Sequence, residues 1–163
     1  MFVSSFETSL DTKGRVSVPA SFRHALEGGT RLYLYPALDG APCLECGGDA
    51  LMQQNRHVMM RMSPNSVARQ VFMNRAVSKA AEVRMEDSGR IKIPEKHLTI
   101  AGIDKTLIFV GAMDRFYIWE PSRYAAHDAR MEAQLGDMQD ALEGSFTAAF
   151  TGAQTGLCGE ADE

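Results

Sequence analysis

An internal repeat at an offset of 75 residues places the strongest limit on what this chain can fold into. Residues 10–19 return as residues 85–94, and both segments carry a Gly-Arg pair, an alternating apolar stretch and a closing proline. The same register aligns a second block: residues 32–35 with 107–110, Ala37 with Ala112, Asp39 with Asp114, and Glu45 with Glu120. Two separated blocks in one register are not a chance match, so the sequence predicts two copies of one structural unit.

Each copy has the pattern of short strands joined by turns. Residues 16–18 alternate apolar and polar side chains before Pro19 ends the run, and the turn before them has Asp and Gly where turns favour them. The predicted strands are 7–10, 16–18, 32–35 and 43–45 in the first copy and 81–85, 90–93, 107–110 and 116–119 in the second. A short helix is predicted at 20–26, closed by two glycines.

The two copies are expected to share one core. A unit of about 40 residues with strands this short cannot bury enough apolar surface to fold alone. The sequence therefore predicts an α+β protein in which the copies interleave into one β-barrel with pseudo-twofold symmetry, flanked by helices.

Helical patterns follow each copy. Residues 49–62 suit an amphipathic helix, and Ser63-Pro64 is expected to start another that runs to Asn74, because serine caps a helix and proline suits its first position. Two further helices are predicted at 121–134 and 137–142. The predicted organisation is 1–48 first repeat, 49–80 helical connector, 81–124 second repeat, 125–150 C-terminal helices and 151–163 disordered acidic tail, with the repeats forming one compact domain.

The charge is divided unevenly along the chain. The formal net charge is −4, but residues 126–163 hold one arginine against eight acidic residues, a net of −7. Residues 1–125 hold 16 basic and 13 acidic residues, a net of +3. The duplicated body is therefore mildly basic, and binding to phosphate depends on such local charge rather than on the total.

The composition predicts a cytoplasmic protein with no membrane partner. No apolar run approaches the roughly 20 residues that cross a bilayer, and the first residues lack the basic and apolar stretches of a signal peptide. Three cysteines, an odd number, argue against a disulfide framework and for a reducing compartment.

The Gly-Arg turns carry the most suggestive chemistry. If Val16 and Val18 face the core, Arg15 faces solvent, and the same parity exposes Arg90 and Lys92. Pairing the copies would bring both turns to one face, and a two-stranded ribbon with arginines has the width to enter the major groove of DNA. The candidate DNA-binding residues are Lys13, Arg15, Arg90 and Lys92, supported in the turns by Asp11, Gly14, Glu86 and Gly89.

A purely structural interpretation competes with this one. Asp11 and Arg15 lie four residues apart across the turn and can form a salt bridge that only stabilises the hairpin. The second copy repeats the pair as Glu86 and Arg90. The two interpretations are compatible, because an acid can hold a guanidinium in place for a phosphate or a base.

At this point the chain resembles the MraZ family. The resemblance rests on Asp11-x-Lys13-Gly14-Arg15, the following apolar-x-apolar-Pro, Phe22-Arg23, and the degenerate second copy, and it covers roughly residues 1–124. It implies the swapped-hairpin fold shared with AbrB-like transcription factors. It also implies a nucleoid-associated, DNA-binding regulator at the promoter of a division and cell-wall gene cluster. It also implies octamer-like rings of identical subunits that present many DNA-binding faces to short direct repeats.

The family pattern carries over unequally to the two turns. Lys13 and Arg15 match the basic DNA-contacting turn, Asp11 matches its acid, and Arg90 matches the arginine in the second copy. Ser88 stands where the first copy has Lys13. The second face is therefore expected to be less basic than the first.

Other signals are weaker. Cys43-x-x-Cys46, with His57 and Cys158, lacks the second pair that structural zinc sites use, so Cys43 is interpreted as a small core residue. Methionines between residues 52 and 85 favour packing or a subunit interface. Arg56, Arg61, Arg69 and Arg75 are interpreted as solvated. No catalytic or cofactor motif is predicted, and the alternative function is an antitoxin-like or scaffold interaction protein without specific DNA readout.

Overall fold

The structure, a computed structural model, describes residues 1–154. The chain divides into two compact units, Met1–Tyr124 and Ala125–Glu163. Both copies of the repeat lie in the first unit, which holds all the strands found among the described residues.

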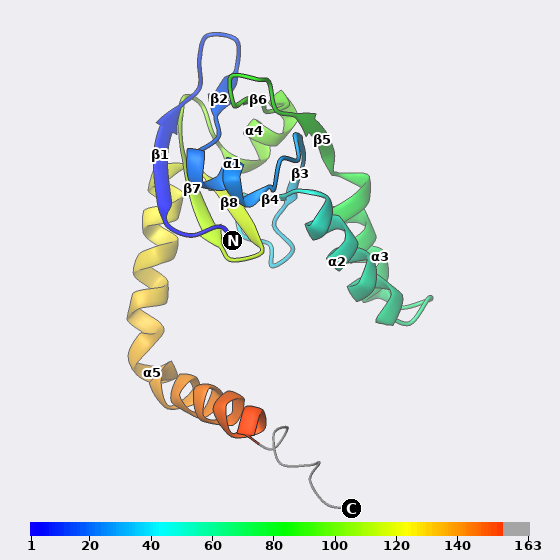
Figure 1. Cartoon of the computed structure of the whole chain (residues 1–163), viewed down its shortest axis with the longest axis vertical. Coiled ribbons are helices and arrows are strands. Elements are labelled where there is room, and N and C mark those ends of the chain that lie inside the picture. Colours follow the sequence, from blue (N-terminus) through cyan, green and yellow to red (C-terminus); the bar gives the residue numbers. More distant parts are fainter. Residues whose placement is uncertain (155–163) are drawn as a thin grey trace, which may run out of the picture. The chain divides into compact units, whose positions relative to one another are not determined.

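Antiparallel strands form the framework of the first unit (Figure 1). Six strands make one sheet in the order β1-β7-β8-β4-β3-β5, and β2 and β6 make a separate two-stranded ribbon. The sheet strands are β1 (Ser5–Ser9), β3 (Arg31–Pro36), β4 (Leu44–Gly47), β5 (Ala81–Arg84), β7 (Thr106–Ala112) and β8 (Arg115–Trp119). The ribbon strands are β2 (Arg15–Ser17) and β6 (Arg90–Lys92). The predicted α+β class is confirmed, and all eight predicted strands are present with small shifts at their ends.

Strands of one copy pair with strands of the other. β1 pairs with β7, β3 pairs with β5, and β2 pairs with β6, each in antiparallel register. The main buried cluster includes Val16 and Phe22 from the first copy and Ile91 and Phe109 from the second. The two copies therefore build one core between them.

The predicted barrel is wrong in one respect, because the six-stranded sheet is open. β1 and β5 are its edges. Each edge strand runs into a Gly-Arg turn, after which the chain pairs with the other copy's ribbon strand. The ribbon therefore covers one side of the core without joining the sheet's hydrogen-bonded ladder.

The repeat offset also changes near the end of each copy. Tyr33 pairs with Gly47, whereas Ile108, 75 residues after Tyr33, pairs with Trp119, 72 residues after Gly47. The loop between β3 and β4 is longer than the loop between β7 and β8, which accounts for the change. The gapless alignment of Glu45 with Glu120 is therefore not a structural equivalence.

Two short helices pack the core beside the ribbon, α1 (Ala20–Ala25) and α4 (Glu95–Ala101). Helix α4 is the counterpart of α1, 75 residues later. Phe22 of α1 is fully buried in a cluster of aromatic rings, and His97 of α4 holds the equivalent place in the second copy.

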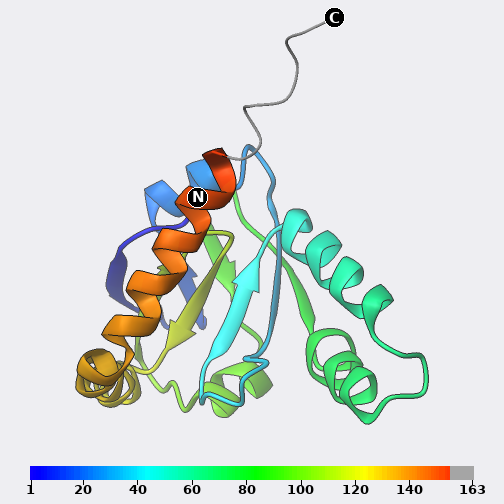
Figure 2. The ribbon, with the colours of Figure 1, turned by 90° about the horizontal axis from the view of Figure 1, so that it is seen from below.

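The connector is a pair of helices beside the β3 side of the sheet, as Figure 2 shows. It comprises α2 (Asp49–Arg61), α3 (Val67–Met73) and a π-helical turn η1 (Asn74–Ser78). The predicted helix start at Ser63-Pro64 is wrong, because Ser66 is the N-cap and its Oγ accepts a hydrogen bond from the Arg69 N–H at 3.2 Å. Ser63 belongs to the turn before it, since its carbonyl accepts from the Ser66 N–H.

A single helix, α5 (Pro121–Gln154), follows the second copy. It replaces the two helices predicted at 121–134 and 137–142, and Gly136 between them has helical backbone. The helix also includes residues 151–154, which were predicted to be part of a disordered tail. Residues 155–163 of that tail lie outside the described residues.

His97 is a buried titratable residue of the core. Its Nε2 lies 2.9 Å from the Lys79 carbonyl oxygen, and its Nδ1 is buried without a hydrogen-bond partner among the described residues. Burial lowers the pKa of His97 below its ordinary value of 6.5. The unfolded chain therefore binds this proton at a higher pH than the folded protein does.

We expect the free energy of unfolding to be greatest above pH 6.5 and to fall as the pH drops through the lowered pKa of His97. Urea denaturation between about pH 7.5 and pH 5 measures the change. In His97→Gln the amide can still donate to the Lys79 carbonyl but does not titrate, so its stability should depend less on pH. The same pH dependence in both proteins would contradict the assignment.

Candidate nucleic-acid interface

The ribbon brings the cationic candidates together on one outer face. Arg15 lies opposite Lys92, Val16 opposite Ile91, and Ser17 opposite Arg90. Val16 and Ile91 are fully buried against the core. Because side chains alternate along a strand, the flanking residues point to the outside, as the sequence predicts.

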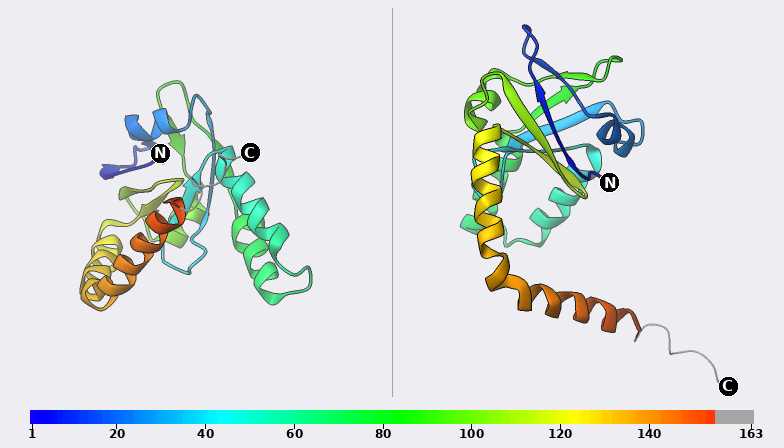
Figure 3. Two further views of the ribbon diagram at one scale, coloured as in Figure 1. Left: turned by 60° about the horizontal axis from the view of Figure 1, so that its bottom comes forward. Right: turned by 90° about the vertical axis from the view of Figure 1, so that its left-hand side faces the viewer.

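Both Gly-Arg turns have the same backbone design. The Asp11 N–H donates to the Arg15 carbonyl at 2.8 Å, and the Glu86 N–H donates to the Arg90 carbonyl at 2.8 Å. The glycine N–H of each turn donates back to the carbonyl of the acidic residue. Gly14 and Gly89 have φ of 73° and 78°, a left-handed conformation that other residues adopt only under strain. Figure 3 shows the two turns at the same end of the first unit.

A reciprocal network of charges joins the turns. The Arg15 Nε donates to Asp11 Oδ2 at 2.8 Å within its own turn, and its Nη1 lies 3.5 Å from Glu86 Oε2 across the ribbon. The Arg90 Nη1 lies 3.7 Å from Asp11 Oδ2 in the opposite direction. The salt bridge between Asp11 and Arg15 is confirmed, and it extends to the other copy. Arg15 is thus held by acids of both copies, and Arg90 lies near the acid of the first copy, on a partly exposed surface.

Asp11 remains ionised throughout the physiological range. The Arg15 N–H, the Arg15 guanidinium and the Lys13 N–H all hydrogen-bond its carboxylate, and together they lower its pKa to about 2. The same interaction with Asp11 raises the pKa of Arg15. The Asp11 carboxylate is therefore always charged when it pairs with Arg15.

Ser88 gives the second turn a different internal pattern. Its hydroxyl donates to Glu86 Oε2 at 3.2 Å and accepts from Arg90 Nε at 3.3 Å. Serine thus links the acid to the arginine in this turn. It adds no positive charge, in agreement with the sequence comparison of the two copies.

Arg23 is the cation that the sequence analysis did not select. It is exposed on α1, and a Cβ added to Gly89 would lie 2.5 Å from its Nη1. A first-copy arginine therefore lies against the second-copy turn, where Ser88 contributes no charge. Only the Phe22-Arg23 pair of the family pattern pointed to it in the sequence.

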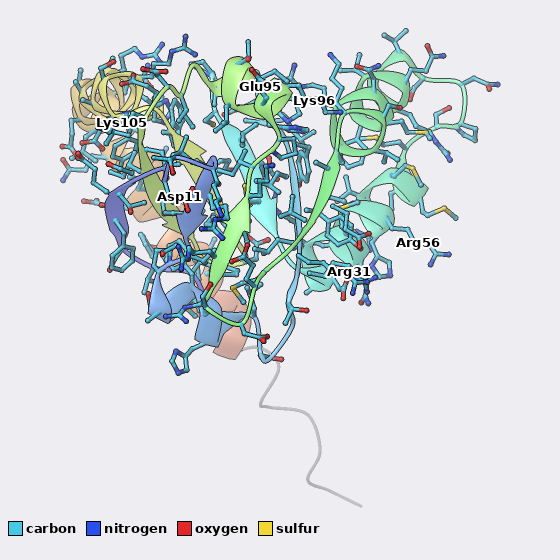
Figure 4. The ribbon with its side chains drawn as sticks, turned by 90° about the horizontal axis from the view of Figure 1, so that it is seen from above. Asp11, Arg31, Arg56, Glu95, Lys96 and Lys105 are labelled. Carbon is cyan, nitrogen blue, oxygen red and sulfur yellow. The ribbon has the colours of Figure 1, made fainter. Side chains whose placement is uncertain are left out.

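The connector arginines have varied roles. Arg75 donates through Nε and Nη2 to the Ala37 carbonyl at 3.0 and 2.6 Å, which fixes η1 to the loop after β3. Arg69 Nη1 donates to the Met62 carbonyl at 3.4 Å. These two contacts are structural, while Arg56 and Arg61 are exposed. Figure 4, viewed from the end with the turns, shows Arg56 far to the side of Asp11.

The Cys-x-x-Cys pair belongs to the core. Cys43 and Cys46 are fully buried, and Cys43 packs with Ala37 and Trp119. Burial raises the pKa of the Cys43 thiol to about 12. Among the described side chains, no group of histidine, cysteine and acidic residues is arranged to hold a metal ion. Cys158 lies outside the described residues.

Comparison with known proteins identifies the family. A family profile described as "MraZ protein, putative antitoxin-like" matches residues 76–142. A curated relative from Hyphomonas neptunium, named "Transcriptional regulator MraZ", is 38% identical over 133 residues, which cover 82% of this chain and 81% of the relative. The chain belongs to the MraZ family.

Two further relatives extend the match to most of the chain. MraZ proteins of Beijerinckia indica and Methylocella silvestris, both named transcriptional regulators, are 36% and 34% identical over 86% and 90% of this chain and 87% and 90% of their own lengths. The MraZ resemblance drawn from the sequence is thereby confirmed. MraZ relatives are named as regulators and not as enzymes, which agrees with the prediction that the chain is not an enzyme. Among the described residues, no helix has the length and apolar character needed to cross a membrane.

Proposed function

We propose that this MraZ-family chain is a sequence-specific DNA-binding transcriptional regulator. The carrying observation is the paired ribbon, which holds Arg15 and Arg90 on one outer face through acids of both copies. The names of its curated relatives support regulation of transcription.

In the proposed complex, the β2–β6 ribbon enters the major groove. Arg15 and Arg90 then reach base edges, where a guanidinium can donate two hydrogen bonds to guanine. Lys13 in the first turn and Lys92 opposite Arg15 on the ribbon neutralise phosphates. Asp11 and Glu86 orient the arginines before DNA arrives, which lowers the entropy cost of binding.

The pairing of strands across copies supports the swapped-hairpin, AbrB-like fold implied by the family resemblance. In this architecture the two halves of one chain take the places of two subunits. The pseudo-twofold axis then relates β2 to β6 within the ribbon. The two turns contact neighbouring positions along one DNA groove.

The proposed assembly is a ring of identical subunits, octamer-like, bound to short direct repeats. Exposed apolar side chains on the connector support a contact between subunits: Met60, Val67, Val71 and Val77. A single ribbon makes few phosphate contacts, so one subunit alone binds weakly. Several ribbons at the spacing of the repeats gain avidity without any new contact.

The proposed target is the promoter of a division and cell-wall gene cluster, which makes the chain a cytoplasmic, nucleoid-associated protein. The test is footprinting of the purified full-length chain on the DNA upstream of its own gene, with its mass measured in solution. We expect protected direct repeats, a mass of several subunits, and an absence of protection when half a helical turn is inserted between repeats. Uniform weak protection of unrelated DNA would reject specific readout.

The alternative is an antitoxin-like or scaffold protein. The words "antitoxin-like" in the description of the matching family profile favour this candidate. Its activity would reside in the C-terminal region and not in the ribbon. A chain lacking residues 151–163 separates the two functions. If the shortened chain gives the same footprints as the full-length chain, the DNA-binding proposal is supported. If neither chain gives a footprint, and the shortened chain alone loses binding to a protein partner, the alternative is supported.

A further inference from the structure

The two turns differ in what covers their glycines. A Cβ on Gly14 would meet nothing within 4 Å, whereas one on Gly89 would lie 2.5 to 2.9 Å from Nη1, Cδ and Cζ of Arg23. The equivalent of Arg23 in the second copy is Leu98, which is half-buried against the core. The symmetry of the repeat therefore breaks at this position.

Neighbouring interactions fix where Arg23 stands. Phe22 is fully buried among Phe2 of the first copy and Phe109 and Phe116 of the second, so the next residue of α1 has little freedom of position. The Val18 N–H donates to the Gly89 carbonyl at 2.9 Å, which ties the end of β2 to the second turn. These interactions hold the base of the Arg23 side chain beside that turn.

The charge of Arg23 is available to a ligand. Among the side chains that the structure describes, no carboxylate forms an ion pair with it, whereas Arg15 and Arg90 both pair with acids. Within the same residues Lys13 provides a cation outside any ion pair at the first turn, and Ser88 provides none at the second. Arg23 therefore supplies from the first copy the positive charge that the second copy lacks.

We propose that Arg23 binds a DNA phosphate beside the second turn, in place of the lysine that the second copy lacks. This inference rests on the proposed DNA-binding function. Arg23 projects from α1 and not from the ribbon, so it meets the backbone that flanks the groove rather than the base edges within it. With Arg23, the two turns make the same number of phosphate contacts, although the first turn has a lysine and the second has a serine in its place.

Binding of Arg23→Ala to the operator and to an unrelated duplex tests the proposal. A phosphate contact carries no sequence information, so both affinities should fall by the same factor, roughly tenfold for each phosphate that Arg23 no longer binds. The slope of log affinity against log salt should become shallower by about 0.9 for each engaged subunit. Arg23→Lys should keep most of the affinity, because an ammonium also binds phosphate.

The sharpest test is rescue. Ser88→Lys places at the second turn the residue that the first turn has, so Arg23→Ala combined with Ser88→Lys should regain affinity and salt slope. The control is Arg56→Ala, which removes the same charge from α2, away from Asp11 in Figure 4, and should change binding little. If Arg56→Ala lowers the affinity as much as Arg23→Ala does, the loss of one positive charge from the chain explains both results, and the proposal is overturned.

The failures of the two proposals are distinguishable. If the unmodified chain does not bind the operator, the proposed function fails, and this inference with it. If it binds and Arg23→Ala binds equally well, only the inference fails. Reduced thermal stability with an unchanged salt slope, or failure of the rescue, would make Arg23 a structural residue and also overturn the inference.

Discussion

Arg15→Ala should abolish retardation of the operator while leaving the mass of the assembly unchanged. The variant removes one oriented guanidinium from every ribbon, and each arginine–guanine pair discriminates about tenfold or more. In an assembly that engages several repeats, these reductions multiply. Gel retardation across a protein titration measures the change in affinity, and light scattering measures the mass.

Arg31→Ala is the matched control for this variant. Arg31 also forms an exposed ion pair, with Asp49 at 3.0 Å, but it lies on β3 away from the ribbon. Arg90→Ala should have an intermediate effect, because its closest carboxylate lies at 3.7 Å and its guanidinium is less firmly oriented. Normal retardation by Arg15→Ala would remove the main residue of the DNA-binding proposal. A reduced mass would mean that the turn serves assembly instead.

The strands and the parity of the ribbon could be predicted from the sequence, because both depend on local patterns. Alternation at period two placed Val16 and Ile91 in the core and Arg15 outside, and the repeat predicted that both copies would do the same. The turns were predicted from their Asp and Gly residues, and the structure gives Gly14 and Gly89 the left-handed backbone that glycine tolerates. What the local pattern lacked was the partner of each strand, since the pairing of β1 with β7 joins residues about a hundred positions apart.

The parts that sequence reasoning missed depend on interactions between distant segments. The place of Arg23 beside Gly89 follows from the packing of α1, and the neighbouring Phe22 is its only signal in the sequence. The start of α3 was misplaced because Ser63 and Ser66 are both acceptable caps, and the chain uses the second. In α5 a break was predicted between residues 134 and 137. The structure continues the helix through Gly136, because a single glycine does not suffice to end a helix.

Phe22→Ala should destabilise the first unit by about 3–5 kcal/mol, the usual cost of emptying a buried phenylalanine site. The Phe22 ring lies 5.3 Å from Phe2, 5.2 Å from Phe116 and 6.2 Å from Phe109, between centroids, so it joins both copies in one cluster. Such a reduction is a large fraction of the stability of a typical domain. Thermal unfolding at a fixed protein concentration should show a Tm lower by about 10 °C or more.

Phe6→Ala is the matched control, because Phe6 packs on the same ring at 5.5 Å but is 37% exposed. Its removal empties a site that water can partly fill, so the destabilisation should be less than half of that for Phe22. Because Phe22 touches both copies, its variant should unfold in one cooperative transition at lower temperature. Two separate transitions would instead mean that the copies fold independently, and that the core is not shared in the way the strand pairing requires.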